Sequence, residues 1–213
     1  MIPLHPLAND AEARATLERA WARIWGRPPD HAELDYAQAI AWLETGYGRI
    51  GQFANMASQG IYNWGGLQKG SPDASGACPP HMFPGVDSGA PRCFFGYQTD
   101  DEAAEAFLRT LTKTAHWPVL DAMQGSPEAV AHALNQPPAY YEGSRPLDRA
   151  FAETEYAKAI RGKLAEIHSG GGHLPAEGPG AGMKKASNWA LAFGLGGAGL
   201  LGLWFLRQGA KRA

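Results

Sequence analysis

The sequence predicts a mainly α-helical protein: a lobed α+β domain with a small β- and loop-rich part, a flexible linker and one C-terminal transmembrane helix. Three observations predict this class. Apolar residues recur at helical spacing through most of the first 167 residues. Two short strand candidates flank a long Pro- and Gly-rich segment. An uncharged run of 20 residues near the C-terminus has the length of a bilayer span.

The chain has 213 residues, which is enough for one ordinary domain and an appendage. Residues 1–167 contain 14 Lys and Arg against 20 Asp and Glu, a net charge of −6, whereas residues 168–213 contain 5 against 1, a net charge of +4. An acidic body lacks the basic face that phosphate contacts need, so we expect no nucleic-acid partner. The basic C-terminal part flanks the apolar run and indicates a lipid bilayer instead.

The domain is predicted to begin with two helices. Residues 10–25 place Trp21 and Trp25 on one face, and we interpret these side chains as core rather than as a sugar-binding platform. Asp30 is the expected N-cap of the second helix, with a glutamate three residues later in the capping-box position. The apolar stripe of this second helix ends at Glu44, directly before a glycine-rich turn.

A small sheet is predicted to follow. Residues 63–68 and 93–98 have the composition of strands, and residues 69–92 between them are expected to form a long irregular loop. Loops of this length inside a compact domain are usually functional, so we expect this segment to form a smaller lobe. Asp73 and Asp87 lie in it and are candidates for a second catalytic carboxylate, although loop aspartates are mostly turn formers.

The two cysteines, Cys78 and Cys93, both belong to this lobe. A disulfide between them would close a loop of about 15 residues and stabilise the fold by about 3 kcal/mol in the chain-entropy model. Two free thiols in a reducing compartment are the alternative, and the sequence leaves both open. The spacing excludes a Cys-x-x-Cys motif, which disfavours a zinc ribbon or a thioredoxin-type site.

The rest of the chain is expected to contain helices that start near Thr99, at Ser126 and near residue 148, the last of them ending at residue 167. Residues 168–186 read as a Gly- and Pro-rich linker. Residues 187–206 are the predicted transmembrane helix, with tryptophans near both ends, and residues 207–213 form a basic tail. The globular domain is therefore expected to comprise residues 1–167.

Glu44 is the candidate catalytic residue, because of its place at the end of a helix. The carbonyl end of a helix disfavours a further negative charge, and apolar neighbours such as Trp42 and Leu43 penalise the ionised carboxylate. Both effects raise the pKa of a carboxyl group. A carboxylic acid that keeps its proton near neutral pH is what a glycosidase uses to protonate a leaving oxygen.

The order of two motifs resembles the lysozyme-like glucosaminidases of glycoside hydrolase family 73. A helix end Glu44-Thr45-Gly46-Tyr47-Gly48 is followed, after a spacer, by Asn63-Trp64-Gly65-Gly66-Leu67-Gln68. The resemblance extends over roughly residues 30–167, and it includes an aromatic strand before an acidic helix start. It implies a lysozyme-like fold, cleavage of peptidoglycan, and Glu44 as general acid in a cleft between two lobes.

The resemblance also implies the residues that would contact the glycan strand: Asn63, Trp64, and Tyr140 or Tyr141, one of which matches the tyrosine thought to position sugar or water. Two chemistries stay open. An N-acetylglucosaminidase needs an activated water, and a lytic transglycosylase needs only Glu44, first as acid and then as base, to give 1,6-anhydro-muramoyl ends.

Two further functions have to be weighed. A non-catalytic, membrane-tethered glycan-binding module would have no need of an acid at this helix end. A zinc hydrolase is disfavoured because the seven histidines show no His-Glu-x-x-His spacing. We therefore expect neither a metal nor another cofactor, and we expect the glycan strands of peptidoglycan and the lipid bilayer as partners.

The side of the membrane on which the domain lies is open. Two positive charges precede the span and three follow it, a bias that barely favours a cytoplasmic C-terminus. The first seven residues lack the features of a secretory signal peptide. A virion membrane, or a bacterial inner membrane reached by another export route, would reconcile these two observations.

Overall fold

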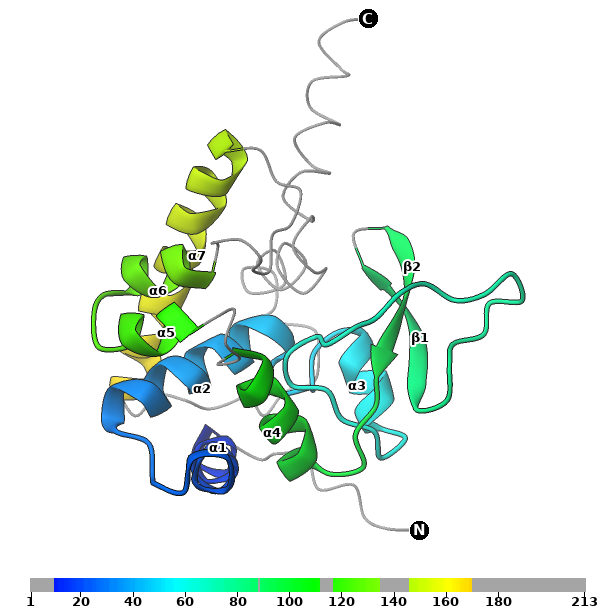
Figure 1. Cartoon of the computed structure of the whole chain (residues 1–213), viewed down its shortest axis with the longest axis horizontal. Coiled ribbons are helices and arrows are strands. Elements are labelled where there is room, and N and C mark those ends of the chain that lie inside the picture. Colours follow the sequence, from blue (N-terminus) through cyan, green and yellow to red (C-terminus); the bar gives the residue numbers. More distant parts are fainter. Residues whose placement is uncertain (1–9, 88, 112–116, 135–145, 170–213) are drawn as a thin grey trace, which may run out of the picture.

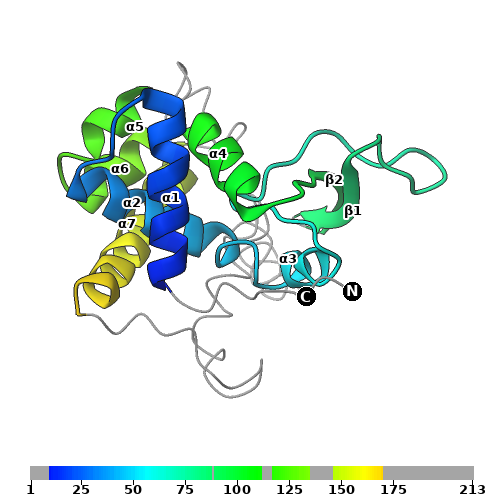
Figure 2. The same cartoon turned by 90° about the horizontal axis from the view of Figure 1, so that it is seen from below.

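The computed structural model describes residues 10–87, 89–111, 117–134 and 146–169. These residues form helices and one hairpin of strands, in two groups that Figures 1 and 2 show side by side. In chain order the elements are α1 (Asp10–Trp25), α2 (His31–Thr45), α3 (Gln52–Ala57), β1 (Met82–Asp87), β2 (Ala90–Phe95), α4 (Asp100–Leu111), α5 (Trp117–Ala122), α6 (Pro127–Leu134) and α7 (Pro146–His168). The mainly helical class is thus confirmed, with a small two-stranded sheet.

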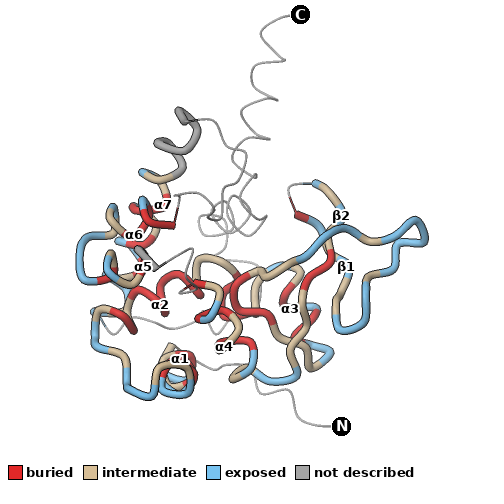
Figure 3. Tube along the Cα trace, in the orientation of Figure 1, coloured by how far each residue is buried: buried red, intermediate tan, exposed pale blue. Residues whose placement is uncertain are grey.

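Helix α2 lies at the centre of the larger group, and Figure 3 shows most of its length buried. Its start is fixed locally, because the Asp30 side chain accepts from the Glu33 N–H while the Glu33 carboxylate accepts from the Asp30 N–H. Its end is fixed by Gly46, which adopts the left-handed conformation and donates its N–H to Trp42. The predicted capping box and the predicted stop are both present.

The core of this larger group forms where α1, α2, α4, α6 and α7 meet. Trp21 is fully buried in it, as the core interpretation of that tryptophan predicted. Trp25 is only partly buried but packs against the same cluster, with its ring 4.2 Å from that of Trp21. The other fully buried large side chains of this core include Leu17, Ile40, Tyr47, Trp64, Phe107, Leu108, Leu111, Val119, Met123 and Ile160.

The smaller group consists of α3 and an antiparallel hairpin of β1 and β2, which pair from Met82 with Phe95 to Asp87 with Ala90. Its own small core joins Phe53 to Phe94, edge to face at 5.5 Å. Two sequence-based assignments were wrong here. Strand β1 lies inside residues 69–92, which were expected to be irregular, since a proline and a glycine within β1 hide its strand pattern.

Residues 63–68, expected to be a strand, instead form a turn. The Asn63 amide donates to the Leu67 carbonyl and accepts from the Leu67 N–H, which closes the chain on itself over four residues. Gly66 takes a positive φ within this turn. Only single bridges remain of the expected pairing, from Gln68 to Phe94 and from the neighbouring Tyr62 to Tyr97.

A disulfide joins Cys78 to Cys93, so the structure contains the first of the two alternatives for these cysteines. Cys93 is buried in β2, and the bond ties the loop before β1 to that strand. Among the residues that the structure describes, no helix is long and apolar enough to cross a membrane. The predicted span at residues 187–206 lies outside the described residues, as do the linker from residue 170 and the basic tail.

Candidate functional site

Glu44 lies in the last turn of α2, and Figure 1 shows the C-terminal end of this helix on the side of the smaller group. Its Oε1 accepts a hydrogen bond from the Tyr156 hydroxyl at 2.7 Å, and Tyr156 comes from α7, 112 residues further along the chain. As a whole residue Glu44 is half-buried. The residue predicted to be the acid is therefore held by a defined partner from a helix that is distant in the sequence.

The pKa of Glu44 is the property that matters most for its chemistry. Burial raises this pKa to about 7, and the hydrogen bond from Tyr156 acts in the opposite direction. The direction agrees with the expectation from sequence. A carboxyl group with this pKa is substantially protonated at neutral pH and can give up the proton to a base that develops beside it.

The turn after Glu44 is fixed by Thr45. The Thr45 hydroxyl donates to the Trp64 carbonyl at 2.7 Å and accepts from the Gly48 N–H at 2.8 Å. Gly48 has little room for a side chain, because a Cβ there would lie 3.1 Å from the Asn63 carbonyl oxygen. The two motifs that carry the family resemblance are thus in direct contact, which sequence spacing alone did not establish.

Asn63 and Trp64 were expected to contact substrate, and the structure revises this expectation. Both residues are 0% exposed. The Asn63 amide also donates to the Phe95 carbonyl, and the Trp64 indole N–H donates to Asp100 at 2.8 Å. Because their polar atoms are used inside the protein, both residues shape the turn beneath Glu44 rather than offer a surface to a glycan.

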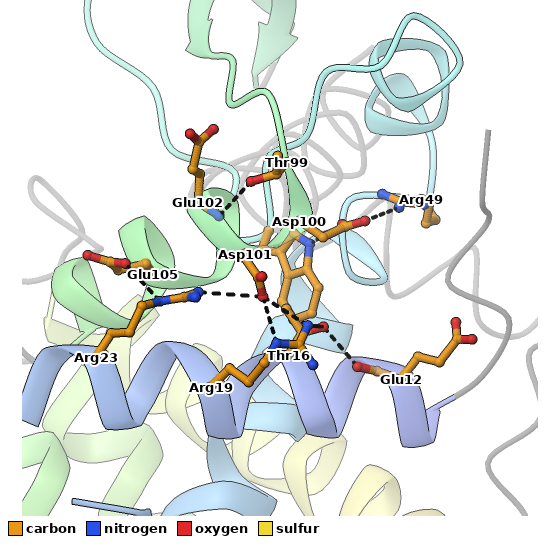
Figure 4. Close-up of polar contacts among 11 residues, drawn as sticks. Glu12, Thr16, Arg19, Arg23, Arg49, Thr99, Asp100, Asp101, Glu102 and Glu105 are labelled. Carbon is orange, nitrogen blue, oxygen red and sulfur yellow. Dashed lines mark hydrogen bonds and ion pairs between the residues drawn. The ribbon is translucent and has the colours of Figure 1, made fainter. Parts of the chain in front are cut away.

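The acidic start of α4 connects the site to the two groups of elements. Asp100 accepts from Trp64 and forms an ion pair with Arg49 at 2.8 Å, while Asp101 pairs with Arg19 of α1 at 2.9 Å. Figure 4 shows the carboxylates of α4 reaching both α1 and Arg49. These acids therefore have structural partners.

The two candidates for a second carboxylate differ in their surroundings. Asp73 is exposed, and its Oδ1 accepts from the Ser75 N–H, the Ser75 hydroxyl and the Ala77 N–H, so it forms its own turn. Asp87 is buried at the end of β1, where its Oδ2 accepts from the Gln68 amide at 2.6 Å. Asp73 behaves as the turn former that loop aspartates usually are.

Tyr140 and Tyr141 lie outside the described residues. Within the described part of the chain, no group of three or more His, Cys, Asp and Glu side chains is arranged to hold a metal ion. The partner that sequence reasoning missed is Tyr156. Helical spacing can show that Tyr156 lies on the buried face of its helix, but it gives no signal for which residue of another helix it meets.

Comparisons of this chain with protein-family models, with curated proteins and with solved structures found no match.

Proposed function

We propose that this protein cleaves the β-1,4 glycosidic bonds of the glycan strand of peptidoglycan, as an N-acetylglucosaminidase with Glu44 as the general acid. The observation that supports this most is the environment of Glu44. Burial raises the pKa of its carboxyl group to about 7, and the Tyr156 hydroxyl donates a hydrogen bond to Oε1. The order of motifs, which resembles the lysozyme-like glucosaminidases, provides the substrate class.

The chemistry follows from the protonation state. A glycosidic oxygen is a poor leaving group unless it receives a proton as the bond to the anomeric carbon breaks. Protonated Glu44 supplies this proton, and the resulting carboxylate is then a base. Tyr156 keeps one carboxyl oxygen fixed by donating to Oε1, which leaves the other oxygen to face the substrate.

A lytic transglycosylase is the second candidate, and one observation favours it. Asp73 accepts three hydrogen bonds from its own turn, and Asp87 is buried against Gln68. Both are engaged within the smaller group of elements. A transglycosylase requires no second carboxylate, because the Glu44 carboxylate can take the proton from the sugar's own hydroxyl after the bond has broken.

We further propose that residues 187–206 anchor the protein in a membrane, bacterial or viral. The support is the sequence: an uncharged run of 20 residues, tryptophans near its ends and basic flanks. The Gly- and Pro-rich segment before it would let the domain reach the cell wall from that anchor.

The variant Glu44→Gln tests the enzymatic proposal. The amide keeps the shape of the side chain but has no transferable proton, so digestion of purified wall sacculi should slow by at least about 100-fold. Glu18→Gln is the matched control, since Glu18 is exposed on α1. Unchanged digestion by Glu44→Gln would refute the general-acid role and leave a glycan-binding module as the better proposal.

The products of the wild-type reaction decide between the two chemistries. Reducing-end N-acetylglucosamine is expected from the glucosaminidase, and 1,6-anhydro-muramoyl ends would identify the transglycosylase. Mass spectrometry of the released fragments distinguishes the two, because the anhydro product lacks the water that hydrolysis adds.

A further inference from the structure

A buried charged group lies where α7 contacts Asp10 of α1 and Trp42 of α2. Lys163 of α7 is only 5% exposed, and its Nζ is 3.2 Å from Oδ2 of Asp10, the first residue of α1. The same Nζ lies 4.3 Å from the centre of the Trp42 ring. Lysine is almost never buried unless it is paired, so this position calls for an explanation beyond packing.

Tyr47 is the third polar member of this group. Its hydroxyl donates to Oδ1 of Asp10 at 2.7 Å, so both oxygens of that carboxylate are used. Tyr47 is fully buried, and its ring lies between those of Trp42 and Trp64. We call Asp10, Tyr47, Lys163 and Trp42 together the Asp10 cluster.

The backbone of Tyr47 makes the cluster unusual. Tyr47 has a φ of 57°, in the left-handed region that bulky residues rarely adopt. Such a conformation persists only where the surrounding structure holds it, and it is found most often at functional sites. Here the hydrogen bond to Asp10 and the two indole rings hold it, only three residues after Glu44.

Helix α7 contacts the end of α2 at two points. Tyr156 and Lys163 are seven residues apart, which places them two turns apart on the same face of the helix. Tyr156 bonds to Glu44, and Lys163 contacts Trp42 and Asp10. The contact made by Lys163 and the contact made by Tyr156 thus join the same face of α7 to the same end of α2.

We propose that Asp10, Tyr47 and Lys163 are positioning residues for Glu44: they hold the turn after α2 and the register of α7, and thereby keep the Tyr156 hydroxyl on the Glu44 carboxyl. This inference deepens the proposed glycosidase function and its kinetic test depends on it. The charged groups that face Lys163 are Asp10 and Glu166, at 3.2 and 3.4 Å, and Tyr156 is the titratable group hydrogen-bonded to Glu44.

The test uses the full chain. The double variant Asp10→Asn/Lys163→Met removes both charges together, so that no unpaired charge is left buried, and methionine keeps the packing against Trp42. Tyr47→Phe removes only the hydroxyl. Lys163→Arg keeps the charge and is the conservative variant. Activity on sacculi is measured per folded molecule, well below the melting temperature of each variant.

Loss of positioning should lower kcat by roughly 10- to 100-fold in the double variant, with KM changed by less than about threefold. Lys163→Arg should retain most of the wild-type kcat. A purely structural cluster would lower the melting temperature of the double variant and leave kcat unchanged, and that outcome would overturn the inference.

A mutant cycle with Tyr156→Phe identifies the route of the effect. If the Asp10 cluster acts through the Tyr156 hydroxyl, the substitutions of the double variant should lower kcat much less in a Tyr156→Phe background than in the wild type. Strictly additive losses would mean that the cluster acts elsewhere, and they would overturn the inference as well.

Direct titration of the Glu44 carboxyl by NMR, assigned with Glu44→Gln, separates this inference from the proposed function. The titration midpoint should differ between the wild type and the double variant, and Tyr156→Phe should abolish that difference. Identical midpoints refute the positioning role. Shifted midpoints in a protein that does not digest sacculi would retain the positioning role and refute the glycosidase.

Discussion

Glu33 and Glu44 belong to the same helix, yet their surroundings give the two carboxyl groups opposite roles. Glu33 is buried at the N-terminal end of α2, where it pairs with Arg27 and accepts from the Asp30 N–H. Its negative charge also lies at the N-terminal end of α2, where the helix dipole stabilises an anion. Glu44 is at the other end, and its hydrogen bond comes from an uncharged tyrosine. The first carboxylate is structural, and the second is poised to hold a proton.

The raised pKa of Glu44 makes stability depend on pH. In the unfolded chain the carboxyl titrates near 4.5, and in the folded protein near 7. Between these values the folded state binds more protons, so this contribution to stability is complete below pH 4.5 and is lost as the pH rises through 7. Relative to wild type, Glu44→Gln should gain at most about 3 kcal/mol over this interval.

Urea unfolding of the wild type and of Glu44→Gln measures this difference in stability. The pH values should lie between 4 and 8, roughly the range over which Glu44 changes charge. Stability curves that stay parallel over the whole range would show that the Glu44 carboxyl titrates normally in the folded protein. Glu18→Gln, at an exposed position, should give such a parallel curve.

Tyr156→Phe changes the site by one hydroxyl group. Since the hydrogen bond from Tyr156 lowers the pKa of Glu44, its loss should raise that pKa further. The basic limb of the profile of kcat/KM against pH should move to higher pH, because Glu44 acts in its protonated form. The maximal rate should fall, since the carboxyl group loses its fixed orientation. A profile superimposable on that of the wild type would exclude Tyr156 from the site.

At the level of elements, the hairpin and α3 have a hydrophobic core that is separate from that of the larger group. Its separate core is small, comprising Phe53, Met56 and Phe94 with Ile61 and Phe83 packed against them. The disulfide supplements this core by tying the loop before β1 to β2. Removing a covalent link should therefore affect this lobe before it affects the helices.

The paired variant Cys78→Ser/Cys93→Ser tests that link. The disulfide spans 15 residues, for which the chain-entropy model predicts about 3 kcal/mol of stabilisation. Thermal unfolding should show a loss of this order, with amide exchange accelerated mainly in β1 and β2. Alkylation of unreduced wild-type protein, followed by mass spectrometry, should detect no free thiol. Two alkylated cysteines would instead indicate a domain kept in a reducing compartment.

At the level of the whole molecule, the end of α2 joins the two groups of elements. From there Thr45 reaches the turn at residues 63–67, and α7 reaches Glu44 and the Asp10 cluster. Helix α7 continues to His168, whose Nε2 lies 2.8 Å from Asp35 of α2. The contacts of the domain therefore extend to this residue, which was predicted to be the first residue of the linker but belongs to α7.

A chain shortened to residues 1–169 should fold, remain in solution without detergent and digest sacculi at the wild-type rate, since it retains all the contacts described above. The full chain should sediment with membranes and require detergent for release. Fractionation of cells that express each form measures both outcomes. A full chain that stays in the soluble fraction would refute the membrane anchor.

The sequence by itself determined the features that short-range chemistry controls. The start of α2 at Asp30, its end at Gly46 and the position of Glu44 in the last turn all follow from residues within one or two turns of each other. The direction of the pKa shift of Glu44 followed from the same local argument. Strand β1 was not predicted, because its proline and glycine are residues typical of loops.

Only the tertiary structure decided which distant residues meet. The partner of Glu44 is 112 residues away, and the partner of Asp10 in α7 is 153 residues away. Asn63 and Trp64 were expected to contact the glycan, but both are fully buried in the fold. Helical spacing predicts which face of a helix is buried, but not which residues of other elements pack against that face. At this site the residue that only the tertiary structure revealed is Tyr156, whose hydroxyl donates a hydrogen bond to Glu44.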